Sequence, residues 1–248
     1  MDKNDPTIEA MTSDPNQANE IIAWLGLADN DYLAARTLLR RGLLVQGTIL
    51  ANSAIEKYLK TVHRIKNIGF DTRGEKAHNL VKLYKSLKET DSRKDLNESY
   101  LALLIRAYKL RYPDRLEKEY NLALNQGKML VGLDETVFKI RSRIEFSGTR
   151  RPFKFDLLIH QKDETLMQAN HTFGEAKRED LFKGPLTWYE MRVLKNGVWM
   201  EATYIAPAID DGSYDVEGFR HGSSDREYLL QAAPIGQETK DTKTMTGK

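Results

Sequence analysis

Apolar residues recur at helical spacing through the first part of the chain. Between Ile21 and Gly42 they follow each other at steps of three or four residues, which is the pattern of one buried helix face. The same spacing continues in segments 43–69, 78–89 and 96–110. Each of these segments predicts an amphipathic helix.

Stop and start signals separate the predicted helices. Gly42 and Gly69 follow the first two, and Pro113 follows the fourth. The residue before a proline avoids the helical conformation, so the fourth helix must end there. Asp114 is a good helix cap, and it begins a predicted fifth helix that runs to about Ile144.

The pattern changes to β-type alternation beyond residue 146. Residues 152–160 alternate in polarity and predict a strand. In segment 187–207, two β-prone apolar runs flank Asn196-Gly197, a pair that favours a type I′ hairpin turn. Residues 206–235 are rich in Gly, Ser and Asp and predict loops.

The fold class that follows is mainly α. We expect an antiparallel bundle of about five helices, followed by a small β-containing C-terminal region with a hairpin. The predicted divisions are a disordered lead, the helical bundle, a β-rich extension and a disordered tail, at residues 1–17, 18–143, 144–235 and 236–248.

Composition restricts the chemistry. The 248 residues include no cysteine, which excludes disulfides, thiolate metal sites and a cysteine nucleophile, and which fits a reducing cytoplasm. A net charge of +2 makes binding of nucleic acid depend on local basic patches. The polar, acidic N-terminus is unlike a signal peptide, and no apolar run approaches the ~20 residues of a membrane span. We therefore expect a cytoplasmic protein without a membrane partner.

Two basic clusters are candidates for binding phosphate. Arg106 and Arg111 lie near the end of the fourth predicted helix, and guanidinium groups match phosphate geometry. The alternative is that both are solvated or pair with nearby acids. Arg150 and Arg151 belong to the most basic run, 139–154, which fits either a nucleic-acid backbone or a solvated linker.

Histidines and carboxylates provide the catalytic candidates. His78 can act as general base on a ribose 2′-hydroxyl, or it or Asn79 can cap the third helix. His63 lies with Lys57, Lys60 and Arg64 on the second helix, which forms either a basic binding face or a solvated basic stripe.

A metal-dependent nuclease is a rival pattern. It would use Asp156 with Glu175 and Lys177, because an acid followed by Glu-x-Lys can bind magnesium and activate water. The histidines lack metal-ligand spacing, and the chain has no glycine-rich phosphate loop. We expect neither a metal nor a cofactor.

Three segments in a fixed order carry a family resemblance: AIEKYLK at 54–60, AHNLVKLYKSL at 77–87 and RYPD at 111–114. Together they resemble the HEPN superfamily (higher eukaryote and prokaryote nucleotide-binding domains) over residues 18–143. The resemblance implies a helical bundle, dimerisation, and contact with RNA or nucleotides. Many members are endoribonucleases of toxin–antitoxin or phage-defence systems, and others are not catalytic.

The chain departs from the active members at one point. Those carry an Arg followed about one turn later by a His, whereas no histidine follows Arg106 here. Tyr112 lies near the tyrosine motif that a partner nucleotidyltransferase modifies in some toxins, but the motif is incomplete. The resemblance also implies that Glu56 and Lys60 face the dimer interface or a ligand pocket.

The leading hypothesis is a cytoplasmic, homodimeric, HEPN-like protein that binds RNA or nucleotides in a regulatory, toxin–antitoxin or defence context, with a degenerate ribonuclease centre. A nucleotidyltransferase is a candidate protein partner. Alternatives are an active nuclease that uses His78 or the Asp156 set, and an interaction module whose hairpin adds to a partner's sheet. The predicted binding residues are Arg106, Arg111, Lys57, Lys60, Arg150 and Arg151.

Overall fold

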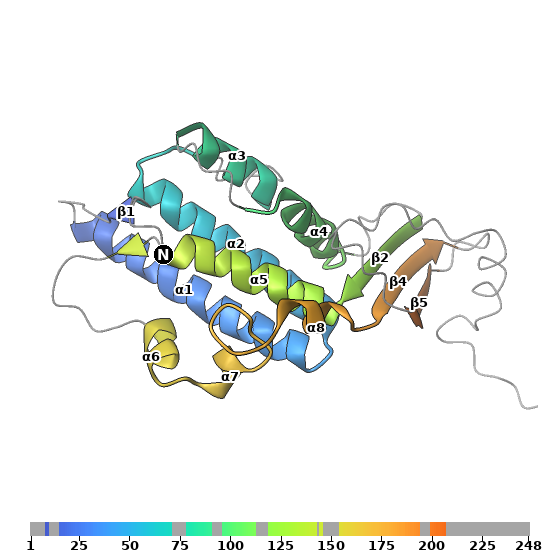
Figure 1. The fold of residues 1–248 in the computed structure, drawn as a ribbon. Coiled ribbons are helices and arrows are strands. Elements are labelled where there is room, and N and C mark those ends of the chain that lie inside the picture. Colours follow the sequence, from blue (N-terminus) through green and yellow to red (C-terminus); the bar gives the residue numbers. More distant parts are fainter. Residues whose placement is uncertain are drawn as a thin grey trace, which may run out of the picture.

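The computed structural model describes residues 8–9, 15–70, 78–90, 96–112, 119–142, 144–145, 154–193 and 199–206. Within them, the longer helices form a bundle, and a small sheet extends from one end of it (Figure 1). These helices are α1 (Pro15–Arg40), α2 (Leu44–Ile65), α3 (Leu80–Thr90), α4 (Glu98–Lys109) and α5 (Gln126–Arg141). The predicted mainly α fold with a C-terminal hairpin is confirmed.

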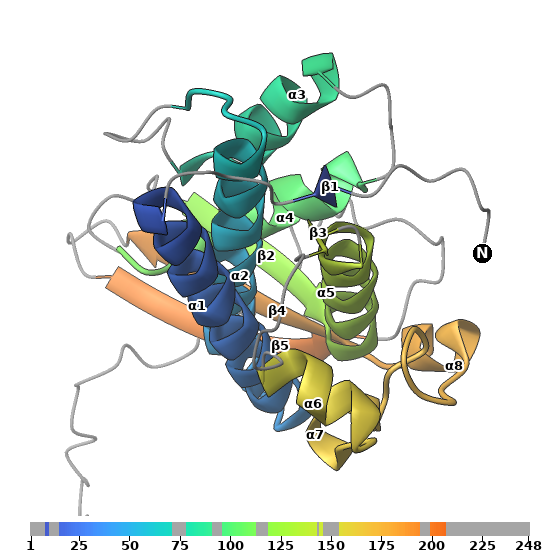
Figure 2. The ribbon, with the colours of Figure 1, turned by 90° about the vertical axis from the view of Figure 1, so that its left-hand side faces the viewer.

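Helices α1 and α2 form an antiparallel pair at the centre of the bundle. Gly42 has φ of 78°, a left-handed conformation that ends α1 and reverses the chain. At the opposite end, the Gln17 side chain donates to Asn67 Oδ1 over 2.8 Å. Figure 2 shows α5 beside this pair, and all three helices contribute residues to the core. Its fully buried members on α1 include Leu25, Ala28, Tyr32, Ala35 and Leu39.

Asparagines cap three of the helices. Asn97 accepts from the Tyr100 amide and Asn125 from the Lys128 amide, over 3.1 and 2.8 Å. Asn79 accepts from the Lys82 amide over 3.0 Å, so Asn79 is the cap of α3 and His78 remains available for another contact.

The predicted fifth helix is too long. Residues 119–125 form the strand β2 (Glu119–Asn125), and α5 begins only at Gln126. Strand β2 pairs with a strand more than 60 residues later, a long-range contact that outweighs local helix propensity.

The C-terminal hairpin forms as predicted. Strands β4 (Leu186–Val193) and β5 (Trp199–Ala206) pair antiparallel, and the sheet order is β2-β4-β5. The turn residues Asn196 and Gly197 lie outside the described residues, so the predicted turn type stays a prediction. None of the described helices is long and apolar enough to cross a membrane.

Residues 154–182, ahead of the hairpin, contain three short helices, which corrects the predicted strand. Residues 154–160 form α6 (Lys154–His160) instead of a strand, because Phe155, Leu158 and Ile159 at helical spacing pack on the bundle core. Two more short helices, α7 (Glu164–Met167) and α8 (Arg178–Phe182), occupy part of the extension expected to be β-rich.

Two described elements fall within the predicted lead, 1–17, wholly or in part. Helix α1 begins at Pro15, and two residues of the lead form β1 (Ile8–Glu9), which pairs in parallel with β3 (Ile144–Glu145). The remaining predicted boundaries stay predictions.

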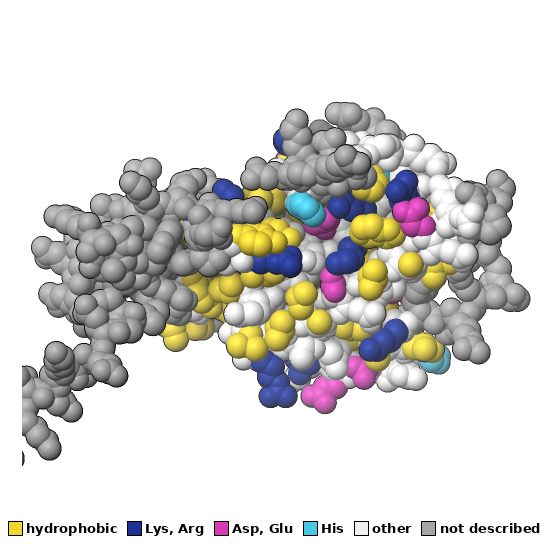
Figure 3. All heavy atoms as spheres, turned by 180° about the vertical axis from the view of Figure 1, so that it is seen from behind, with side chains coloured by type: hydrophobic (Ala, Val, Ile, Leu, Met, Phe, Trp, Pro, Cys, Tyr) yellow, Lys and Arg dark blue, Asp and Glu magenta, His cyan; other side chains and the backbone are white. Residues whose placement is uncertain are grey.

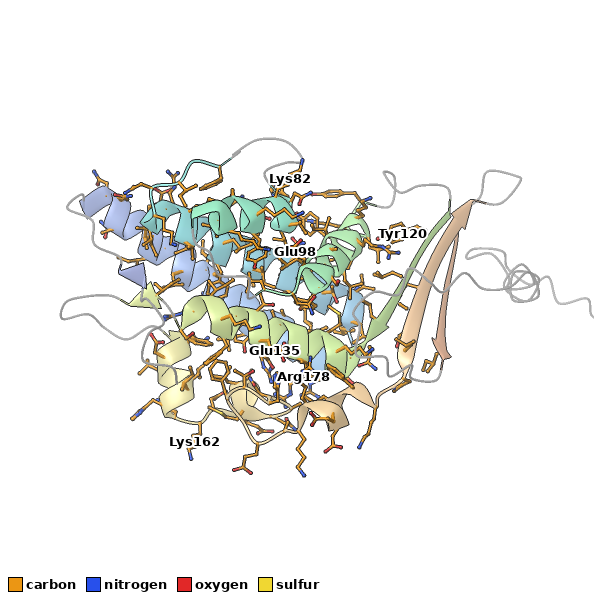
Figure 4. All side chains as sticks on the ribbon, turned by 45° about the horizontal axis from the view of Figure 1, so that its top comes forward. Lys82, Glu98, Tyr120, Glu135, Lys162 and Arg178 are labelled. Atoms are coloured by element: carbon orange, nitrogen blue, oxygen red, sulfur yellow. The ribbon has the colours of Figure 1, made fainter. Side chains whose placement is uncertain are left out.

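The helices α6 to α8 attach to the bundle by packing and by charge. Phe155 is 2% exposed and meets the Tyr32 ring edge-on at 5.7 Å. In Figure 4, Glu135 of α5 and Arg178 of α8 lie close together, and Arg178 Nε donates to Glu135 Oε1 over 3.0 Å. The extension therefore shares the bundle's core.

Gly127 is required by the contact between α5 and α8. A Cβ atom added there would lie 1.8 Å from the Leu181 carbonyl oxygen, so Gly127→Ala must push the two helices apart. We expect it to lower the free energy of unfolding by about 1–3 kcal/mol, measured by urea denaturation. The matched control is Gly26→Ala, whose Cβ has nothing within 4 Å and which should gain stability from helix propensity. Equal effects of both substitutions would contradict the packing explanation.

Asp29 belongs to a buried polar network. It is 1% exposed, accepts from the Tyr58 hydroxyl over 2.6 Å, and lies 3.4 Å from Arg141 Nε. Burial raises the pKa of Asp29 from 3.8 to about 6, against the opposing effects of Arg141 and Tyr58. The folded state thus holds this proton more tightly than the unfolded state.

This pKa predicts a pH dependence of stability. The contribution of Asp29 is fully present below pH 3.8 and is lost as the pH rises through about 6. We expect this group to remove roughly 2–3 kcal/mol of stability between these limits, and Asp29→Asn to lack that decrease. Urea denaturation of parent and variant at several pH values measures the difference. Parallel stability curves would show that Asp29 does not titrate in this range.

Candidate functional site

A histidine–carboxylate pair lies where α2 faces the start of α3. Glu56 Oε1 and Oε2 are 3.0 and 3.1 Å from His78 Nδ1. The Glu56 side chain is 11% exposed, whereas the His78 side chain is 52% exposed. A carboxylate only accepts hydrogen bonds, so Nδ1 carries the proton and Nε2 of the neutral ring is an acceptor. The buried acid thus orients an accessible imidazole.

Lys60 forms an ion pair with Glu56 from the next turn of α2. Its Nζ lies 2.5 Å from Glu56 Oε1, and its side chain is only 8% exposed. The ammonium group also lies over the rings of Trp24 and Phe70, at 5.8 and 5.7 Å from their centroids. Lys60 therefore neutralises the buried Glu56 carboxylate and is not an open phosphate ligand.

Two tyrosine rings and a guanidinium group stack in a row that starts at His78 and lies at the end of α4. The His78 and Tyr108 rings stack, with centroids 6.4 Å apart and planes at 21°. The Arg111 guanidinium lies over the Tyr108 ring at 5.7 Å and over the Tyr112 ring at 5.5 Å. It also donates to the Tyr108 hydroxyl over 3.0 Å. We call His78, Tyr108, Arg111 and Tyr112 the stacking ladder.

The ladder is accessible and mixed in chemistry. Arg111 is exposed and Tyr112 is 40% exposed. Figure 3 shows, on the face opposite to that of Figure 1, a histidine beside acidic and basic side chains, with hydrophobic side chains around them. Such a surface offers π faces for bases, a guanidinium for phosphate and an imidazole for proton transfer.

The structure unites some of the predicted binding residues and separates others. His78 and Lys60 meet through Glu56, and Arg111 joins them through Tyr108. Lys57 pairs instead with Asp31, with 2.5 Å between Nζ and Oδ2.

The other predicted arginines are less clearly placed. Arg106 is half-buried, and its backbone carbonyl accepts from the Tyr120 hydroxyl. Arg150 and Arg151 lie outside the described residues. Their predicted contact with nucleic acid stays a prediction.

The rival metal site receives no support. Asp156 is on α6 and accepts from Arg141 Nη2 over 2.9 and 3.1 Å. Among the described residues, no group of three or more His, Cys, Asp or Glu residues is arranged to hold a metal ion. His63 is fully buried between Leu59 O and Ser86 Oγ, and burial lowers its pKa. The predicted basic stripe therefore does not include an accessible His63.

Sequence reasoning missed two features of this site. The pairing of His78 with Glu56 joins positions 22 residues apart, across the loop between α2 and α3. Tyr108 was not considered, although its spacing of one helical turn from Arg111 is a signal that a cation and a ring share one face.

Residues 21–137 match the family model of the HEPN domain. This part of the chain is a HEPN domain. All members of the stacking ladder and both Glu56 and Lys60 lie within the match. No curated protein and no solved structure matches the chain.

The candidate site is built by the part of the chain that matches the HEPN model. The match ends inside α5, so α6 to α8 and the strands β4 and β5 lie beyond it. No histidine follows Arg106 on α4, but His78 approaches the end of the same helix from α3. The fold thus links the His78 imidazole to Arg111 through Tyr108, although the α4 sequence itself supplies no histidine.

Proposed function

We propose that the HEPN domain binds RNA or a nucleotide on the stacking ladder. The observation that carries the proposal is the continuous stack of His78, Tyr108, Arg111 and Tyr112 at an exposed helix end. A base stacks on an aromatic or imidazole face, and Arg111 accepts the neighbouring phosphate. Glu56 and Lys60 hold His78 in place beneath the ligand.

We infer the biological setting from the family resemblance. The chain acts in the cytoplasm as a homodimer, in a regulatory, toxin–antitoxin or defence context. A nucleotidyltransferase is the protein partner that fits a tyrosine next to the site. The cysteine-free composition and the resemblance to dimeric HEPN proteins support this setting.

Binding without cleavage is the activity that the site supports best. Cleavage at a ribose 2′-hydroxyl needs a base for the attacking oxygen and an acid for the leaving oxygen. His78 can supply one of these functions, whereas arginine keeps its protons at neutral pH and Lys60 is held in the buried pair.

A second candidate is RNA cleavage with His78 as the base, favoured by the orientation that Glu56 imposes on its ring. The two are separated by incubating labelled single-stranded RNA with the full chain in EDTA and measuring binding and cleavage together. We expect retarded, intact RNA, and about tenfold weaker binding by His78→Ala. Metal-independent cleavage that His78→Ala abolishes would establish the second candidate. Unchanged binding by that variant would reject the ladder as the RNA site.

A further inference from the structure

A large cavity lies between the bundle and the extension, away from the stacking ladder. Its volume is about 820 Å³, within the range of small-molecule sites. The walls come from the end of α1, the start of α5, the helices α7 and α8, and the start of β4. Figure 1 shows α7 and α8 beside these ends of α1 and α5. Much of the wall therefore lies beyond the HEPN match, which ends at residue 137.

Two arginines contribute positive charge to the cavity. Arg40 Nη1 donates to the Glu164 carbonyl oxygen over 3.3 Å, which fixes the guanidinium against the wall. Its other N–H groups make no hydrogen bond within the described part of the chain. The Arg41 side chain, exposed at the rim, has neither a hydrogen bond nor an ion pair with any described residue. Both guanidinium groups thus keep donors for a ligand.

The acids on the wall do not cancel this charge. Asp180 pairs with Lys183 over 2.6 Å, and Lys183 lowers the pKa of Asp180. The Glu164 side chain is 84% exposed, and its carboxylate lies 4.0 Å from Arg40 Nη2. Lys183, which is not part of the lining, neutralises Asp180, so the lining keeps the charges of Arg40 and Arg41 against Glu164 alone and favours an anion.

The rest of the lining suits a neutral, partly apolar body. Leu44, Leu130, Leu181 and Pro185 provide hydrocarbon surface. Gln126 donates its amide N–H groups to Leu39 O and Arg40 O, over 2.6 and 3.1 Å. Its side-chain oxygen makes no hydrogen bond with any residue that the structure describes, so it can accept one from a ligand.

From these contacts we infer that the cavity is a second binding site, for a small organic anion with an apolar ring. The phosphate or carboxylate head lies on Arg40 and Arg41, and the ring lies against the leucines. The inference is independent of the function proposed for the stacking ladder. Because α7 and α8 form part of the wall, the ligand joins the extension to the bundle.

Four probes measure the contributions of the anionic group and of the apolar ring to binding. They are naphthyl phosphate, naphthoate, naphthol and inorganic phosphate. Binding to the full chain is followed by naphthyl fluorescence and, for phosphate, by calorimetry. We expect naphthyl phosphate or naphthoate to bind at least about tenfold more tightly than naphthol and inorganic phosphate. The preferred head then distinguishes a phosphate ester from a carboxylic acid as the natural ligand class.

Two variants and two controls locate the binding. Arg41→Glu reverses a charge that no described residue pairs with, and should weaken binding of the preferred probe about tenfold or more. Thr187→Trp fills the cavity from β4 and should abolish binding. Lys154→Glu, an exposed charge reversal on α6, and His78→Ala, which disables the ladder, should leave the affinity unchanged.

The inference is overturned by either of two results. One is that neither anionic naphthyl probe binds with a Kd below about 10 mM. The other is that Arg41→Glu binds the preferred probe as the parent does. If Thr187→Trp fails to fold, Arg41→Glu alone decides. Because RNA binding at the ladder is measured separately with His78→Ala, failure here leaves that proposal standing.

Discussion

Replacing Arg36 by methionine is expected to lower the free energy of unfolding by about 3–5 kcal/mol, because it leaves a buried charge unpaired. Arg36 is 0% exposed and forms an ion pair with Asp134, which also accepts from the Tyr32 hydroxyl over 2.8 Å. The same guanidinium donates to the carbonyl oxygens of Thr165 and Gln168, over 3.3 and 2.6 Å. One side chain thus joins α1 to α5 and to the segment around α7.

Urea denaturation measures this effect, and two further variants test its cause. Arg64→Met removes the exposed pair with Glu20, whose side chains are 45% and 40% exposed, and should cost at most about 1 kcal/mol. The double variant Arg36→Met with Asp134→Leu should recover part of the loss, since an apolar pair replaces a buried charge. A cost for Arg36→Met as small as that of Arg64→Met would contradict the network.

The second large effect concerns RNA. We expect Arg111→Glu to weaken binding of single-stranded RNA about 10–100-fold at about 0.15 M salt, because it replaces a stacked cation by an anion. Arg111 is exposed, and its contacts with Tyr108 and Tyr112 do not support the core. Helical content and melting temperature should therefore stay close to those of the parent.

Other charge reversals are the controls for this experiment. Fluorescence anisotropy with labelled RNA should show an unchanged affinity for Lys162→Glu, an exposed charge reversal outside the basic run 139–154, and a further decrease when Arg106→Glu is added to Arg111→Glu. A loss of affinity that is equal for Arg111→Glu and Lys162→Glu would indicate general electrostatic attraction in place of a defined site.

The helices and their inward faces could be predicted because local spacing determines them. Tyr32, Leu39, Leu80 and Leu104 are all buried as their positions in the apolar pattern indicate. The helix end at Gly42 was equally readable, because glycine favours the positive φ that Gly42 adopts.

Elements that depend on distant partners were predicted wrongly or missed. Residues 119–125 contain helix-forming residues, but pairing with β4 makes them a strand. Residues 154–160 alternate in polarity, yet Phe155 reaches the core only in a helix that packs against Tyr32. Spacing along the sequence carries no information on such contacts.

Single residues of the candidate site could be predicted from the sequence, whereas the contacts between them could not. His78, Lys60 and Arg111 are individually recognisable as chemically capable residues, and the family resemblance placed them in one domain. That Glu56 would orient His78, and that Tyr108 would link His78 to Arg111, depends on how α2, α3 and α4 pack. The cavity formed with α7 and α8 depends on the extension and had no signal in the sequence.

The most direct test of RNA binding at the stacking ladder observes the histidine side chains themselves. The chain has five histidines, so the imidazole signals in a ¹H–¹⁵N spectrum can be assigned by single substitutions. On titration with single-stranded RNA, we expect the signals of His78 to shift strongly, while those of buried His63 and of His160 on α6 stay in place. RNA that binds fully while the His78 signals do not move would contradict the proposed site.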